Sequence, residues 1–272
     1  MTDPIISVQD LSVSYGTHRV LDRINLEVRR GEVIVLLGAS GSGKSTLLRH
    51  IVGLERPDSG TVSIKGVDVN RCSEKELNFL RRSMGVAFQE AALFGSLTTK
   101  ENVEMPLREL TSLADPVIDI MSYLKLASLG LGEAGHLMPE ELSGGMKKRA
   151  AIARAAALDP ELLIFDEPSA GLDPIVAAEL DELILFLKRL FEMTIVVVTH
   201  EMASAFRIAD RIAFLYKGSL IAVENKQAFQ VNTDPRIRQF VDRVPSPIGE
   251  SAAVQRRVRE LAGIKEHQDE EH

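Results

Sequence analysis

The chain has 272 residues, of which 45% are hydrophobic and 26% charged, a balance typical of a soluble globular protein. A formal net charge of −7 disfavours broad nucleic-acid binding, because that function requires a basic face. Cys72 is the single cysteine, so no intramolecular disulfide can form. The sequence shows no signal peptide and no run of the roughly 20 apolar residues that a membrane helix needs. We therefore expect a cytoplasmic protein.

The first part of the chain is rich in strand patterns. Its predicted elements, in order, are strands at 5–15, 20–30 and 31–38, a helix at about 44–52, a short strand pair at 61–69, a helix ending near Arg82 and a strand at 84–89. Ser73 and Glu76 form a capping box that starts the second of these helices.

From residue 90 to 158 the periodicity becomes helical, and prolines punctuate it. Strands and helices then alternate, with predicted strands at 162–165 and 194–198, helices at 174–191 and after His200, and a hairpin of 211–216 with 219–224. This alternation predicts an α/β fold with a mostly parallel sheet covered on both faces, preceded by an N-terminal antiparallel β part. The helical block, about 90–158, is interpreted as an inserted α-helical subdomain.

The stretch GASGSGKS contains Gly38, Gly43, Lys44 and Ser45 at the spacing of a phosphate-binding loop, G-x-x-x-x-G-K-[ST]. Its glycines let backbone amides point at a phosphate, while the lysine reaches the β and γ oxygens and the serine hydroxyl ligates Mg²⁺. Because the stretch lies between an apolar strand and a helix, it predicts a P-loop NTPase core that binds a nucleotide.

A second apolar strand, LLIFDE, ends in Asp166 and Glu167. Carboxylates at this position lie at the C-terminal edge of the sheet, where α/β proteins bind ligands. We expect Asp166 to hold Mg²⁺ and Glu167 to polarise the water that attacks the γ-phosphate.

The stretch LSGGM contains a further glycine pair at the start of a helix, with Ser143 as its predicted N-cap. Amides of Gly144 and Gly145 would form a second anion-binding concavity. One nucleotide on one phosphate loop does not need this second concavity. We therefore expect it to serve the nucleotide of a second copy of the chain in a two-fold dimer.

With these motifs in order, the sequence resembles the ATP-binding subunits of ABC transporters from about residue 5 to 240. The resemblance implies that Tyr15 stacks on adenine, that Gln89 links Mg²⁺ and the attacking water to a transmembrane partner, and that His200 contacts the γ-phosphate. It implies a nucleotide site of Tyr15, Gly38, Ala39, Ser40, Gly41, Ser42, Gly43, Lys44, Ser45 and Thr46, completed by Ser143, Gly144 and Gly145 of the other copy. Glu167, His200 and Gln89 are then catalytic, and Ser45, Gln89 and Asp166 are metal ligands.

The resemblance also implies the cofactors and partners of the chain. They are ATP and Mg²⁺, a second copy in a head-to-tail dimer, and a transmembrane permease that inserts a short helix into a groove of the helical block around 89–108. Met146, where the family usually has glutamine, resembles the ATPases of lipid-handling permeases with periplasmic MCE-domain proteins, and a small cytoplasmic regulatory subunit is a further candidate. This subset implies phospholipid transport for outer-membrane lipid asymmetry, with the chain peripheral on the inner membrane.

Two alternatives remain, the ATPase of another ABC importer or exporter and a soluble ABC ATPase that acts in DNA repair or on ribosomes. The expected domains are an ABC ATPase domain at 1–244, with its RecA-like core at about 1–89 and 159–244, and a tail at 245–272. In the tail, Val254, Val258 and Leu261 form one apolar stripe. The tail is therefore either a solvated chain end or an amphipathic helix.

Overall fold

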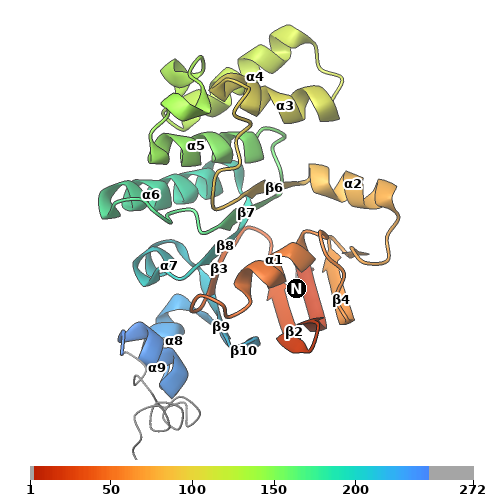
Figure 1. Ribbon diagram of the computed structural model, residues 1–272, viewed down its shortest axis with the longest axis vertical. Helices are drawn as coiled ribbons and strands as arrows, with labels where there is room; N and C mark the ends of the chain where they lie inside the picture. The colour runs from red at the N-terminus through yellow and green to blue at the C-terminus, as the bar shows by residue number, and fades with distance from the viewer. Residues whose placement is uncertain (1–2, 245–272) are drawn as a thin grey trace, which may run out of the picture. The chain divides into compact units, whose positions relative to one another are not determined.

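The computed structural model describes residues 3–244 (Figure 1). The predicted tail helix, with Val254, Val258 and Leu261, lies outside the described residues. The chain divides into two compact units, Met1–Asn232 and Thr233–His272. In the second unit the described part contains α9, Pro235–Val241, which starts after the N-cap Asp234.

The N-terminal β part is an antiparallel sheet with the strand order β2-β1-β4-β5. Its strands are β1 (Ile6–Tyr15), β2 (His18–Val28), β4 (Ser59–Ile64) and β5 (Val67–Asp68). Apolar side chains of this sheet pack with those of α1 (Lys44–Ile51) in one buried cluster, and the sheet thereby supports the helix that follows the phosphate loop.

The second sheet has the strand order β10-β9-β3-β8-β7-β6. Its strands are β3 (Val33–Leu37), β6 (Met84–Ala87), β7 (Leu162–Asp166), β8 (Thr194–Thr199), β9 (Arg211–Tyr216) and β10 (Ser219–Asn225). Within the described residues, β10 pairs antiparallel with β9, and the other neighbouring strands of this sheet pair parallel. Strand β3 lies between β8 and β9 and is buried at every residue, as expected for a central parallel strand. The predicted α/β fold is confirmed.

Helices α2 and α6 begin at residues that the sequence marks as caps. Ser73 and Glu76 form the predicted capping box before α2 (Glu74–Arg82). Asp173 accepts hydrogen bonds from two backbone amides at the start of α6 (Pro174–Phe191), and Pro174 occupies its first turn. Two short helices, α7 (Met202–Ile208) and α8 (Lys226–Val231), flank β9 and β10 in sequence.

The described chain between β6 and β7 contains helices and no strand, and it forms the upper part of the view in Figure 1. Its elements are α3 (Thr99–Leu110), α4 (Asp115–Ser128), the short 3-10 helices Gly132–Ala134 and Pro139–Glu141, and α5 (Gly144–Ala155). Helix α5 contacts α3, α4 and β6, and so joins this block to the sheet. In the stretch from 3 to 244, no helix is both long and apolar enough to cross a bilayer.

Candidate functional site

The phosphate loop connects β3 to α1 and carries no side-chain cap at the helix start. Gly43 occupies the N-cap with φ of 105°, and no side chain accepts a hydrogen bond from the first amides of the helix. A Cβ atom at Gly43 would lie 2.8 Å from Leu21 Cδ2, and one at Gly38 would lie 2.3 Å from Leu215 O, so both positions require glycine. The first amides of α1 are therefore available to an anion.

Lys44 places its ammonium group inside this loop. Its Nζ donates to Gly38 O at 2.8 Å and Ala39 O at 3.2 Å, and it lies 3.8 Å from Glu167 Oε1. Burial lowers the pKa of Lys44, and the carboxylates of Glu167 and Asp166 oppose this shift. The structure thus brings the predicted lysine and both predicted carboxylates together at the C-terminal ends of β3 and β7.

Asp166 and Ser45 offer oxygen ligands for a cation. Asp166 Oδ1 is buried and has no hydrogen-bond partner in the described chain. Burial raises the pKa of Asp166, the neighbouring Glu167 raises it further, and Lys44, Arg49 and the Ser45 hydroxyl oppose the rise. An orphaned buried carboxylate oxygen beside a serine hydroxyl fits Mg²⁺, which prefers oxygen ligands. Within residues 3–244, no group of three or more His, Cys, Asp or Glu side chains is arranged to hold a metal.

Glu167 follows β7 in a left-handed conformation, with φ of 47°. Its N–H donates to Val198 O at 2.8 Å, which fixes the turn against β8. The residue is 9% exposed, and its side chain accepts hydrogen bonds from Thr199 Oγ1 at 3.2 Å and from His200 Nδ1 at 2.9 Å. A carboxylate can only accept, so Nδ1 carries the proton in this contact. The predicted base and the histidine predicted to contact the γ-phosphate are thus in direct contact.

Tyr15 lies at the end of β1 beside the first turns of α1. Its hydroxyl donates to Glu55, and the residue is 48% exposed. The hydrogen bond to Glu55 and burial raise the pKa of Tyr15, and the side chains of Arg49 and Thr46 oppose that rise. The tyrosine ring is therefore free to stack on a flat group near the phosphate loop.

Ser143 is the N-cap of α5, and its Oγ accepts a hydrogen bond from Met146 N at 3.2 Å. Ser143 and Gly144 are exposed, whereas Gly145 is buried. Within residues 3–244 no hydrogen bond connects Ser143, Gly144 or Gly145 to the phosphate loop, and Figure 1 places α5 in the helical block, apart from α1. The two glycine concavities therefore do not meet within one chain.

Gln89 is exposed in the turn after β6, and in the described chain its side chain makes no hydrogen bond to Asp166 or Glu167. The backbone carbonyl of Gln89 instead accepts from Lys148 Nζ, and Lys148 Nζ also lies 3.4 Å from Glu167 O. Neither Lys148 nor Thr199 was predicted from the sequence as a site residue. Thr199 directly precedes His200 at the end of the buried strand β8, and it lies beside Glu167 because β8 pairs with β7.

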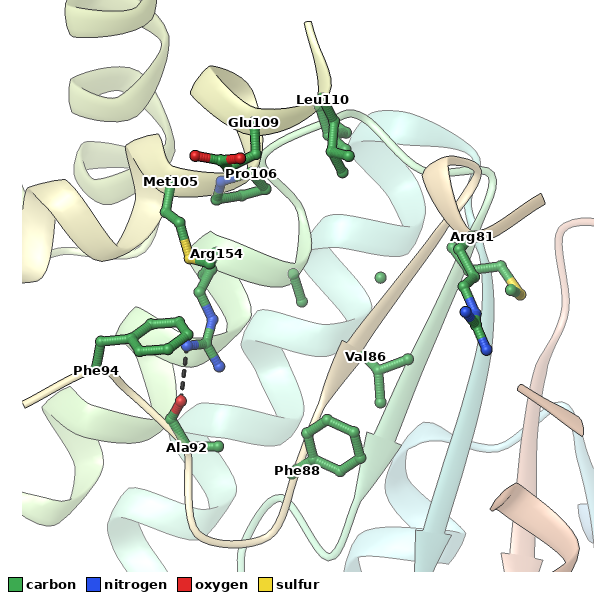
Figure 2. A pocket seen from close by; sticks show the side chains of 14 residues that line it. Arg81, Val86, Phe88, Ala92, Phe94, Met105, Pro106, Glu109, Leu110 and Arg154 are labelled. Atoms are coloured by element: carbon green, nitrogen blue, oxygen red, sulfur yellow. Dashed lines mark hydrogen bonds between the residues drawn. The ribbon is translucent and has the colours of Figure 1, made fainter. Parts of the chain in front are cut away.

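A groove of about 520 Å³ opens between the turn after β6 and α3. Figure 2 shows the groove with Phe88 and Phe94 on one side and Met105, Pro106 and Leu110 on the other. Its charged lining groups are Arg81, Glu109 and Arg154. An apolar groove of this size with a few charged groups fits a short amphipathic helix.

Comparison with known proteins gives consistent results. A family model described as ABC transporter matches residues 21–170. The intermembrane phospholipid transport system ATP-binding protein MlaF of Escherichia coli is 42% identical over 88% of this chain and 88% of its own length. The probable ribonucleotide transport ATP-binding protein mkl of Mycobacterium tuberculosis is 40% identical over 90% of this chain and 69% of its own length. The solved dimeric structure of the ATP-binding cassette MJ0796 in a post-hydrolysis state, bound to ADP and Pi, has a TM-score of 0.75 and 31% identity and covers 81% of this chain and 98% of that chain.

Proposed function

Because the chain belongs to the ABC transporter family and is an ATPase of that family, we propose that it powers the transport of phospholipid across the cell envelope. The observation that carries the catalytic part is the meeting of Lys44, Asp166 and Glu167 at one edge of the parallel sheet. The following residue roles and partners belong to the same proposal.

The phosphate loop, residues 38–46, holds the phosphates of ATP through its backbone amides and the side chain of Lys44. Amides at the start of α1 have no side-chain partner, so they can donate to the β-phosphate, and the Lys44 ammonium can leave its two backbone carbonyls for phosphate oxygens. Ser45 and Asp166 would hold Mg²⁺, with Gln89 as a further ligand, and the ion would neutralise charge that develops on the phosphates.

Glu167 accepts the proton of the attacking water. Thr199 donates to its Oε2, His200 contacts both carboxylate oxygens, and Oε1 also lies 3.8 Å from Lys44 Nζ in the phosphate loop. Phosphoryl transfer depends mainly on such positioning and on charge stabilisation, so a carboxylate fixed within the site suits the role of base. Release of His200 from Glu167 would let the imidazole contact the γ-phosphate.

A second copy of the chain completes the site. Ser143, Gly144 and Gly145 lie apart from the phosphate loop of their own chain, and an isologous dimer would place each trio over the nucleotide of the other copy. The dimeric structure of the MJ0796 cassette with ADP and Pi supports this arrangement. Hydrolysis would then follow closure of the dimer.

The groove of Figure 2 is the proposed docking site of the transmembrane permease. A permease helix with an apolar face would contact Phe88 and Phe94, and an acidic side chain on it could pair with Arg81. The chain would then lie peripherally on the cytoplasmic side of the inner membrane. A periplasmic MCE-domain protein and a small cytoplasmic regulatory subunit complete the proposed complex.

Phospholipid is the proposed cargo, supported by 42% identity to MlaF over most of both chains. Loss of the protein should then weaken the outer-membrane barrier, with phospholipid accumulating at the cell surface. The 40% identity to mkl favours ribonucleotides as a second candidate cargo. An intact barrier together with defective ribonucleotide uptake in the deletion strain would favour that cargo and contradict phospholipid transport.

A further inference from the structure

The turn after β6, residues 88–94, is held in a strained conformation by α5. Ala91 and Ala92 both have left-handed backbone angles, with φ of 61° and 50°. Two consecutive non-glycine residues in this region are unfavourable unless other contacts fix them. Arg154 of α5 supplies those contacts, since its guanidinium donates to Ala92 O at 2.7 Å (Figure 2) and to Ala91 O at 3.0 Å.

Arg154 also ties this turn to the groove. Its guanidinium lies 5.7 Å from the centre of the Phe94 ring, at cation–π distance, and both side chains line the groove. Phe88 and Ala92 of the same turn line it as well. A partner that enters the groove therefore contacts the strained turn directly.

Lys148 joins the other end of the turn to the catalytic edge. Its ammonium donates to Gln89 O and lies 3.4 Å from Glu167 O. Lys148 is half-buried, and burial lowers its pKa while Glu167, Asp166 and Glu90 oppose that shift. An ammonium has three donors, so one lysine can hold both carbonyls simultaneously.

We propose that Lys148 is a positioning residue that couples the turn at 88–94, and hence occupancy of the groove, to the placement of Glu167. The inference rests on the proposed role of Glu167 as base. Its physical reason is that Glu167 sits in a left-handed turn at the end of β7, and the backbone carbonyl beside Lys148 belongs to that same residue. A shift of the turn moves the ammonium, and the ammonium moves the carbonyl and the attached carboxylate.

The test compares variants of the full-length chain in steady-state ATP hydrolysis with Mg²⁺. Each variant is assayed at a protein concentration at which the unmodified chain hydrolyses ATP. Lys148→Met keeps the aliphatic stem and removes the donors. We expect kcat to fall by roughly tenfold to a hundredfold, the effect of a small misplacement of a catalytic group. The KM for ATP should stay within about twofold, because in the described chain the hydrogen bonds of the Lys148 ammonium go to Gln89 O and Glu167 O and not to the phosphate loop.

Two further variants separate positioning from general stability. Lys148→Arg retains several donors and should recover a large part of kcat. Lys147→Met removes the same charge one residue earlier on α5, where the described side chains show no hydrogen bond or ion pair to Lys147, and it should match the unmodified chain. Hydrogen exchange should show faster exchange at residues 88–94 in Lys148→Met only.

The proposal is overturned if Lys148→Met keeps its kcat, if the variant changes KM alone, or if Lys148→Arg is as impaired as Lys148→Met. Should Lys148→Met fail to fold, Lys148→Gln, with one amide donor group, replaces it under the same criteria. A failure of the proposed function looks different, since the unmodified chain would then not hydrolyse ATP or Glu167→Gln would remain active.

Discussion

Replacing Glu167 with glutamine tests the assignment of the base. The amide keeps the size of the side chain and an oxygen that can accept from Thr199 Oγ1, which lies 3.2 Å away, but it cannot take a proton from water. General-base catalysis contributes about 10²–10⁴ in rate, so we expect kcat to fall by at least a hundredfold.

The fold and the binding of ATP should survive this change. Lys44 loses a partner at 3.8 Å, but Asp166 remains as its counter-charge. We therefore expect a stability loss of about 1–2 kcal/mol, below the roughly 3–5 kcal/mol of a fully broken buried pair. The substitution leaves the backbone amides of the phosphate loop unchanged, so ATP should still bind. Dimers should then accumulate with bound ATP.

The assay is phosphate release, with ATP affinity from equilibrium dialysis and dimer content from light scattering. Glu161→Gln is the matched control, because its carboxylate pairs with Arg30 and Lys65 on the surface and lies outside the site. Hydrolysis by Glu167→Gln at the rate of the unmodified chain would refute the assignment of the base.

Burial and the neighbouring Glu167 raise the pKa of Asp166. A carboxyl whose pKa is higher in the folded chain than in the unfolded chain stabilises the fold at pH values below its unfolded pKa. This stabilisation is lost as the pH rises through the folded pKa. Asp166→Asn should therefore raise Tm of the ligand-free chain at pH 7 by about 2–4 °C, with a smaller gain near pH 4, while Mg²⁺-dependent hydrolysis is lost; an unchanged Tm at pH 7 contradicts this. Gly144→Glu should fold, because a Cβ there meets only Leu172 Cδ2 at 3.6 Å, but its carboxylate should repel a phosphate, so ATP-dependent dimers measured by light scattering should disappear while each chain still binds ATP. Truncation after Arg243 should leave ATP binding unchanged and weaken assembly or ATPase activity in the full transporter; equal assembly and activity would show that the tail is only a solvated end.

Much of the fold could be predicted because its signals are local. The buried strand VIVLL, the capping box of Ser73 and Glu76, and the hairpin turn at Lys217–Gly218 each determine a short stretch of structure. Helices α8 and α9 were not predicted, although Asn225 and Asp234 cap them, because six and seven residues are too few for a clear helical period.

Spacing along the chain could locate the motifs of the site but not the contacts between distant segments. The pairing of His200 with Glu167 depends on β7 and β8 lying side by side, which no local pattern reveals. The reach of Lys148 to the carbonyls of Gln89 and Glu167 depends on how α5 packs on the sheet edge, so periodicity alone identifies Lys148 only as a helical lysine.

The place of β3 in the sheet has a consequence for synthesis of the chain. Val33–Leu37 pairs only with β8 and β9, whose residues begin at Thr194 and Arg211. At the usual rate of translation these partners emerge about 10–30 s after VIVLL. During that interval β1, β2 and β4 of the antiparallel sheet can already pair, since these three strands lie within the first 64 residues. The apolar strand that leads into the phosphate loop has no partner strand on the ribosome, and a nascent-chain chaperone should bind there before any other segment of the main sheet.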